Sequence, residues 1–332
     1  MENQLIWEVR SPDKTVQINV GDYTSFIDDN EEQEEELLEN IHQYFQKRSN
    51  RTITIIDKLT GEIVDSNEYR SFIINHHDID NEHQLGSTGL LNKKLQRDLL
   101  NNLETDGYLN SINILMEDFL ALLEKDMPLK VKRFDHKQFI KQLTFEFDYT
   151  VDYSRLINRL LEIIPLLVDE MNTQSLNKTL LIYLYPESNL SPKEQVKLNE
   201  LLRNLNIKLF VLTDSSIFFS EKLDQTNYFR NGQQVINNEL ISELHWNSPL
   251  DFQVEDIKTS LRNVIENYSS KFELEPIISN YRLTDIILFN TLDLYVCCYS
   301  LKYFGHNFKL DLNRVEIPGT LAKYLDDFMK NV

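Results

Sequence analysis

The clearest hydrophobic pattern of the chain lies between residues 178 and 214. Two nearly all-apolar runs, Lys178–Tyr185 and Ile207–Asp214, have the length of strands that are buried on both faces of a sheet. Between them, Ser191-Pro192-Lys193-Glu194 predicts a helix start, because serine caps a helix, proline fits its first turn and glutamate completes a capping box. The order strand, helix, strand predicts a βαβ unit with a right-handed crossover.

Apolar residues at helical spacing dominate the section that follows Gly86 and Gly89. We expect consecutive helices there, and Pro165 is expected to kink or shift the last of them. The stripes comprise Leu91, Leu95, Leu99 and Leu103, then Ile112, Leu115, Met116, Phe119, Leu122 and Leu123, and they continue over 139–147 and 156–168.

Strand-like runs precede this helical section, at 5–9, 16–20, 52–56, 59–64 and 71–75. Acidic residues crowd 28–39, which we interpret as the solvated face of a helix. Strands on both sides of a helical section predict an α/β fold with a helical insertion. The predicted parts are an α/β head in two pieces, 1–85 and 166–236, a helical leg insertion, 86–165, and a mainly helical C-terminal extension, 237–332.

Within the head we expect one mixed sheet, with 180–185 and 208–212 as its central parallel strands. In the C-terminal extension, helical patterns cover 256–268, 284–304 and 321–329, and 307–317 is expected to be extended. The apolar run 286–304 is interrupted by Asp293 and Lys302, so we expect a buried helix rather than a membrane span. Cys297 and Cys298 are expected to be core thiols of a protein in a reducing compartment.

Composition narrows the functions that this fold can carry. The chain has 34 Lys and Arg against 53 Asp and Glu, a net charge of -19. This charge argues against nonspecific binding of the whole surface to nucleic acid or anionic membrane, but it permits a local basic surface. The N-terminal residues do not form a signal-peptide pattern, and we expect a cytoplasmic protein without membrane contacts.

The glycines argue against nucleotide binding. None of the eight glycines is followed by lysine, which a Walker A phosphate loop requires, and the chain contains no Gly-x-Gly-x-x-Gly. We therefore expect neither ATP hydrolysis nor a dinucleotide cofactor.

A histidine cluster follows the predicted strand 71–75. His76, His77, Asp78 and His83 are residue types that hold a divalent ion, so one alternative function is a metal-dependent hydrolase or nuclease. The other interpretation is a polar loop that caps the strand.

Basic residues gather at one place in the helical section. Lys130, Lys132, Arg133 and Lys137 form the densest basic strip of this acidic chain. Such a strip can contact phosphates without reading sequence, although a solvated helix face is the alternative interpretation. A weaker second strip comprises Lys93, Lys94 and Arg97.

The pattern resembles the ring-forming, DNA-end-binding adaptation protein of type II-A CRISPR systems, in its longer streptococcal form. The βαβ unit carries the resemblance, through the strand at 178–184, the loop to 190–194, the helix to Leu205 and the strand at 208–214. The helix at 156–168 and the order of strands and helices over 1–125 match more loosely.

The resemblance implies a P-loop-like α/β head without a working phosphate loop and a helical leg inserted into it. It also implies a homotetrameric ring around double-stranded DNA and partners in adaptive immunity, namely the integrase complex and the RNA-guided nuclease. Calcium is implied near the junction of head and leg. The candidate ligands there are Glu117, Asp118, Glu124 and Asp126.

Three hypotheses follow from the sequence. The first is a non-enzymatic, sequence-independent clamp on double-stranded DNA ends that acts in CRISPR spacer acquisition. The second is the metal-dependent hydrolase, and the third is a scaffold whose helical leg and C-terminal extension dock protein partners.

Overall fold

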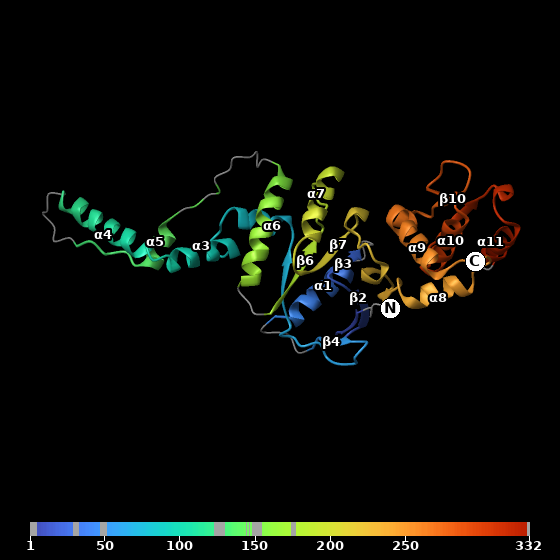
Figure 1. Ribbon diagram of the computed structural model, residues 1–332, viewed down its shortest axis with the longest axis horizontal. Helices are drawn as coiled ribbons and strands as arrows, with labels where there is room; N and C mark the ends of the chain where they lie inside the picture. The colour runs from blue at the N-terminus through green and yellow to red at the C-terminus, as the bar shows by residue number, and fades with distance from the viewer. Residues whose placement is uncertain are drawn as a thin grey trace. The chain divides into compact units, whose positions relative to one another are not determined.

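The computed structural model describes residues 5–28, 33–46, 52–122, 130–143, 145, 147, 155–173 and 177–330. The chain divides into two compact units (Figure 1). Unit 1 comprises Met1–Ile74 and Asn177–Val332, and unit 2 comprises Asn75–Leu176. The helical section of the sequence therefore forms a unit of its own, inserted into the α/β part.

A six-stranded sheet forms the centre of unit 1, in the order β5-β6-β7-β3-β8-β9. The first five strands are parallel, and β9 pairs with β8 in the antiparallel sense. As predicted, the two apolar runs are interior strands that pair from Leu180↔Lys208 to Leu184↔Leu212. The bounds are β3 Tyr23–Ile27, β5 Tyr69–Ile74, β6 Lys178–Leu184, β7 Lys208–Thr213, β8 Thr226–Arg230 and β9 Gln233–Gln234.

Helix α7, Pro192–Arg203, connects β6 to β7 and begins where the sequence predicts. The Glu194 carboxylate accepts hydrogen bonds from the Ser191 amide at 2.9 Å and from the Ser191 hydroxyl at 2.7 Å. This is the acidic half of the predicted capping box, and it satisfies donors that the first helical turn leaves free.

The N-terminal strands form a second sheet, so the prediction of one mixed sheet is wrong. β1 (Leu5–Arg10) lies between β2 (Thr15–Val20) and β4 (Thr54–Asp57), and both pairings are antiparallel. The predicted strand 59–64 contributes only the bridge Ile56↔Ile63. The two sheets share one core with helix α1 (Gln33–Tyr44), and that core includes Trp7, Ile18, Leu38, Ile41 and Phe210.

The sequence analysis did not predict strands β3 and β8, because both strands bury polar side chains. Thr24, Ser25 and Asn227 are almost fully buried, so neither strand is a continuous apolar run. Their polar atoms are satisfied by hydrogen bonds within the protein, for example by the bond from the Ser220 amide to Ser25 Oγ at 2.9 Å.

The C-terminal part of unit 1 is mainly helical, as predicted. Helices α8 (Asn238–Trp246), α9 (Val254–Tyr268), α10 (Thr291–Tyr303) and α11 (Gly319–Lys330) share a core with a small parallel sheet. The sequence did not predict this sheet, although one of its strands lies in the segment 307–317 that was expected to be extended. Its strands are β10 (Ile277–Ser279), β11 (Ile286–Ile287) and β12 (Lys309–Asp311), so 284–304 is only partly helical. No helix among the described residues has both the length and the apolar character that crossing a bilayer requires.

The C-terminal core is continuous with the six-stranded sheet. It contains Cys297 and Cys298, which are free and buried as predicted, together with Ile27 and Tyr228 of the sheet. His306 Nε2 and the Tyr228 hydroxyl form a hydrogen bond of 3.1 Å in this core. Burial lowers the pKa of the His306 ring to about 4.

Unit 2 consists of helices. They are α2 His76–His83, α3 Leu90–Asn101, α4 Thr105–Ala121, α5 His136–Gln142 and α6 Leu156–Thr173. Helix α6 continues through Pro165 and extends beyond the predicted end at 168. It packs against both α2 and α3.

Candidate nucleic-acid interface

Three members of the predicted basic strip, Lys130, Lys132 and Arg133, lie on a segment without regular secondary structure, 130–135, that is anchored to helix α4, and Lys137 lies on α5. The Phe134 amide donates to Asn113 Oδ1 at 2.9 Å, and Asn113 Nδ2 donates to the Phe134 carbonyl at 3.1 Å. Asn113 is buried, so this reciprocal pair fixes the backbone next to the basic side chains.

Arg133 is held by an ion pair with α4. Its guanidinium donates to both carboxylate oxygens of Glu117, at 2.8 and 3.4 Å, and this contact lowers the pKa of Glu117 and raises that of Arg133. Both side chains are exposed, so the ion pair adds little to stability and remains open to exchange with another anion.

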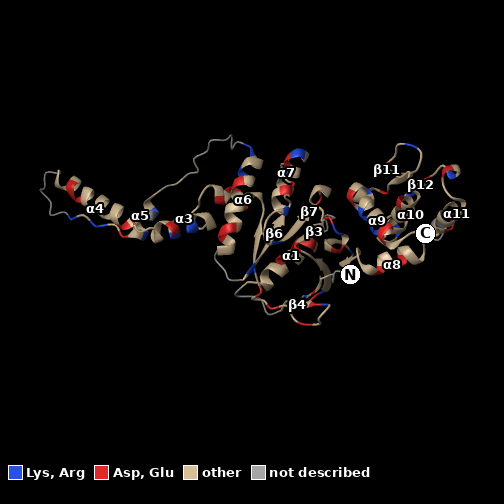
Figure 2. Ribbon diagram, in the orientation of Figure 1, with Lys and Arg blue, Asp and Glu red and all other residues tan. Residues whose placement is uncertain are grey.

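The lysines of the strip are exposed. Lys132 and Lys137 are solvent-facing, as is Lys130, and none of the three forms an ion pair with a described residue. Lys130, Val131, Lys132 and Arg133 line an open groove of about 640 Å³ together with Glu117. Figure 2 shows these basic residues on the chain that leads into α5. The groove therefore presents two ammonium groups without a close ion pair and one exchangeable guanidinium.

The second predicted strip on α3 is largely neutralised by α6. Arg97 donates to both oxygens of the fully buried Glu170 at 2.7 Å, and Lys94 Nζ lies 3.2 Å from Asp169. Lys93 remains solvent-facing. Lys94 and Arg97 therefore connect α3 to α6 within unit 2, and only Lys93 of this strip stays without such a contact among the described residues.

The described residues do not supply a calcium site at the predicted place. Glu117 is engaged by Arg133, and Asp118 follows it directly on α4, so the two carboxylates leave the helix in different directions. Glu124 and Asp126 lie outside the described residues. Within the described ranges no group of three or more His, Cys, Asp or Glu could hold a metal ion, whereas calcium needs six or more oxygens.

The histidine cluster forms helix α2, and the interpretation as a capping loop is wrong. Asp78 accepts from the Asn75 amide and donates its own amide to Asn75 Oδ1, both at 3.0 Å, in a capping box that starts the helix. His83 stacks on Phe147 with ring centroids 5.6 Å apart. His76, His77, Asp78 and His83 are all described, and the structure does not bring them together as metal ligands.

The carboxyl edge of the six-stranded sheet is acidic in this chain. At the carboxyl ends of β6 and β7, Glu187 accepts from the Thr213 hydroxyl at 2.7 Å and from the Asp214 amide at 3.1 Å. Burial is the main cause that raises the pKa of Glu187 to about 7. Asp28 follows β3 at the same edge, which is where open α/β sheets bind ligands. The sequence analysis did not identify Glu187, because its partners lie a helix away in the chain.

Helix α4 carries an exposed apolar stripe, most of which the sequence analysis identified as apolar residues at helical spacing. Tyr108, Ile112, Leu115, Phe119 and Leu122 recur at alternating spacings of four and three, which is the heptad pattern of a coiled-coil seam. Leu115, Phe119 and Leu122 are 65%, 69% and 80% exposed. The helix buries only Leu109 and Asn113.

No protein-family model matches the chain, and no curated protein matches it. Among solved structures, the crystal structure of Stu0660 of Streptococcus thermophilus is similar, with a TM-score of 0.61 and 16% sequence identity. The match covers 98% of this chain and 99% of that chain. At this identity the similarity establishes the fold, over its whole length, and nothing further.

Proposed function

We propose that this protein is a non-enzymatic ring that binds double-stranded DNA ends without sequence preference and acts in CRISPR spacer acquisition. The observation that carries the proposal is the exposed lysine groove of unit 2 in a chain with a net charge of -19. The full-length similarity in fold to Stu0660 supports the family resemblance of the sequence, and the CRISPR role rests on that resemblance.

Lys130 and Lys132 would contact phosphates, which carry charge but no base information. Arg133 would exchange Glu117 for a phosphate, because an exposed ion pair is worth little in water. The acidic remainder of the chain would repel DNA and confine it to the groove. This arrangement provides affinity without sequence readout.

The apolar stripe of α4 supports self-association as part of the proposal. A helix that exposes Leu115, Phe119 and Leu122 in heptad register fits a second copy of the same helix. In a homotetramer, four grooves would act on one duplex, and linked weak contacts multiply in effect.

The proposal assigns no catalytic residue and no nucleotide. Carboxylates at the carboxyl edge of the six-stranded sheet disfavour a phosphate at the place where a P-loop protein would bind one. Calcium stays a prediction that rests on the resemblance, and so do the integrase complex and the RNA-guided nuclease as partners.

A gel shift with linear and covalently closed circular DNA of one sequence tests the proposal. A ring that threads onto ends binds the linear form and not the closed circle. Equal binding to both forms would exclude threading, and binding to neither would favour a protein scaffold. Degradation of the DNA with added divalent metal would favour a nuclease, and a monomeric mass in solution would exclude the ring.

A further inference from the structure

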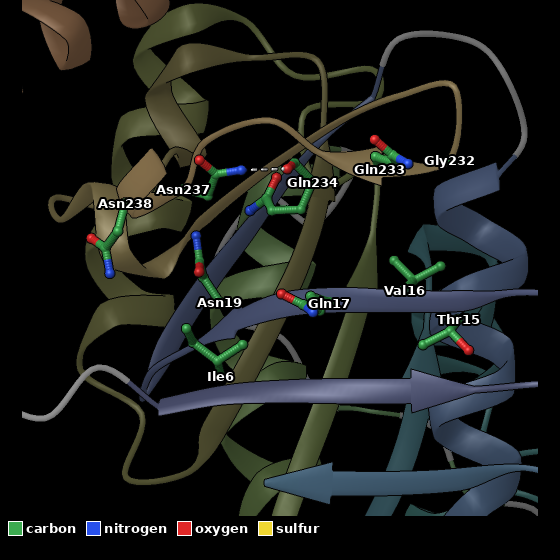
Figure 3. A pocket seen from close by; sticks show the side chains of 10 residues that line it. All are labelled: Ile6, Thr15, Val16, Gln17, Asn19, Gly232, Gln233, Gln234, Asn237 and Asn238. Carbon is green, nitrogen blue, oxygen red and sulfur yellow. Dashed lines mark hydrogen bonds between the residues drawn. The ribbon is translucent and has the colours of Figure 1, made fainter. Parts of the chain in front are cut away.

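Two polar contacts within unit 1 differ in how they respond to pH. The first lies in a notch between β2 and β9, whose lining contains no charged residue (Figure 3). Asn237 Nδ2 donates to the Gln234 carbonyl at 3.1 Å, and Gln234 Nε2 donates to Asn227 Oδ1 at 2.9 Å. Carboxamides do not titrate, so this contact does not change with pH.

The second contact holds the loop between β6 and α7, residues 185–191, against the end of β7. Glu187 lies in this loop, and its carboxylate accepts from the Thr213 hydroxyl at 2.7 Å and from the Asp214 amide at 3.1 Å. The loop begins at Tyr185, whose φ of 51° is uncommon for a residue other than glycine. Glu187 is therefore a side chain that ties the loop to the end of the neighbouring strand.

Glu187 faces a second carboxyl group, that of Asp214. Neither residue forms an ion pair with a lysine or arginine among the described residues. Two carboxyl groups that share a site without a cation hold a proton more tightly than one group in water. Burial is the main cause that raises the pKa of Glu187 to about 7, and the hydrogen bond to the Asp214 carboxyl acts in the same direction.

Other groups around Glu187 do not change charge near neutral pH. The titratable and charged groups at this edge are Tyr23 and Asp28 at the two ends of β3, Tyr185 after β6, Asp214 after β7, Glu35 of α1 and Arg203 of α7. Burial raises the pKa of both tyrosines, so they stay protonated. The Arg203 guanidinium lies 4.6 Å from the centre of the Tyr23 ring and 3.2 Å from Glu221.

We propose that the carboxyl pair of Glu187 and Asp214 is a pH-sensitive latch on the loop 185–191. While the two carboxyls share a proton, Glu187 holds the loop on the end of β7. Once that proton is lost, two like charges face each other in a half-buried site, and opening of the loop relieves both their repulsion and their desolvation. The latch belongs to unit 1 and does not rest on the proposed binding of DNA.

The direction of the pH effect follows from the raised pKa of Glu187. An open loop returns its carboxyl to water, where the ordinary value is 4.5. Between pH 4.5 and about 7 the open form has therefore released a proton that the closed form keeps. Opening becomes up to about tenfold more favourable with each pH unit across this window, and it levels off at higher pH.

Amide hydrogen exchange of the full-length protein between pH 5 and pH 8 measures this opening, read by mass spectrometry on peptides that cover 185–191 and 213–215. Each variant is compared with the wild type at the same pH, which cancels the intrinsic pH dependence of exchange. Glu187→Gln imitates the protonated carboxyl, and Asp214→Asn removes the facing charge. Glu200→Gln, at an exposed position of α7, removes a carboxylate outside the latch and is the matched control.

We expect opening of the wild-type loop, relative to Glu187→Gln, to increase at least about tenfold from pH 5 to pH 8. Asp214→Asn should shift this transition to lower pH, and Glu200→Gln should follow the wild type. The proposal is overturned if the wild type and Glu187→Gln respond to pH alike, or if Asp214→Asn leaves the transition where it is. If Glu187→Gln does not fold, the position of the transition in Asp214→Asn, measured against Glu200→Gln, decides alone.

Discussion

The two units of the protein place their large apolar side chains in opposite ways. In unit 1, Trp7, Phe26 and Phe210 pack in a core shared by two sheets and α1, and Phe210 is fully buried. In unit 2, α4 exposes Leu115, Phe119 and Leu122 to solvent. A helix of this length gains most of its stability from packing, and α4 has little packing within its own unit.

This difference indicates that the two units have different roles. Unit 1 buries the apolar faces of its strands and helices in its own cores, and it supplies hydrogen-bond partners for the buried polar groups of β3 and β8. Unit 2 presents an unpacked apolar stripe and a lysine groove on the same helix and its neighbouring segment. We therefore expect contacts with DNA and with further copies to depend on unit 2, and folding stability to depend on unit 1.

One pair of Phe→Ala substitutions tests this contrast with the largest expected effect. Phe210→Ala should lower the free energy of unfolding by about 3–5 kcal/mol, because it leaves a cavity in a closed core. Phe119→Ala should change it by no more than about 0.5 kcal/mol, because that ring is exposed. Urea titration followed by circular dichroism measures both. A large loss in Phe119→Ala would mean that α4 is packed within the monomer.

Charged substitutions on α4 test self-association. The double variant Leu115→Glu/Phe119→Glu should shift the solution mass from the oligomer to a smaller species, because it places carboxylates in the proposed seam. Val196→Glu, on an exposed position of α7 in unit 1, is the matched control and should leave the mass unchanged. Analytical ultracentrifugation measures the mass. An intact oligomer in the double variant would place the subunit contacts elsewhere.

The pH dependence of stability should report on unit 1 through His306. Its folded pKa of about 4 lies below the ordinary value of 6.5, so the unfolded chain binds the proton more tightly. Stability is therefore lost as pH falls from 6.5 towards 4, by about 2 kcal/mol at pH 5. His306→Gln should reduce this loss. Equal decreases of Tm between pH 7 and pH 5 in both proteins would show that the proton binds elsewhere.

The smallest expected effect concerns the lysine groove. Lys130→Glu/Lys132→Glu should weaken binding to every DNA sequence about tenfold and flatten the salt dependence, since each phosphate contact contributes about -0.9 to the slope of log affinity against log salt. Lys193→Glu/Lys197→Glu on exposed α7 of unit 1 has the same charge change and should bind as the wild type does. Fluorescence anisotropy across a salt series measures both. Unchanged binding of the groove variant would leave Lys93 of α3 as the next candidate.

The sequence predicts those elements of the fold whose cause is local. The strands β6 and β7 are continuous apolar runs because both of their faces are buried, and α7 begins at its own capping residues. β3 could not be predicted, because its polar residues Thr24 and Ser25 are buried, and the partner of Ser25, the Ser220 amide, comes from a distant part of the chain. Helix α2 was missed because its cap, Asn75, lies at the end of a strand-like run.

The candidate site could likewise be predicted only as far as it depends on residues that are neighbours in the sequence. The basic strip is visible in the sequence because its residues are neighbours. Whether each cation is available depends on carboxylates elsewhere in the chain, Glu117 for Arg133 and Glu170 for Arg97. The exposure of the α4 stripe could not be predicted either, since a heptad pattern is the same whether the partner belongs to the same chain or to another.

The insertion of unit 2 between β5 and β6 sets the order in which the protein folds. These strands pair from Tyr69↔Lys178 to Ile74↔Tyr183, so the whole of Asn75–Leu176 must be synthesised before β5 finds its neighbour. At ordinary rates of translation this takes about 5–20 seconds, far longer than helices need to form. Unit 2 can therefore fold on the ribosome ahead of the sheet. During the same interval β5 remains an unpaired strand, so Tyr69–Ile74 is exposed to aggregation and to chaperones.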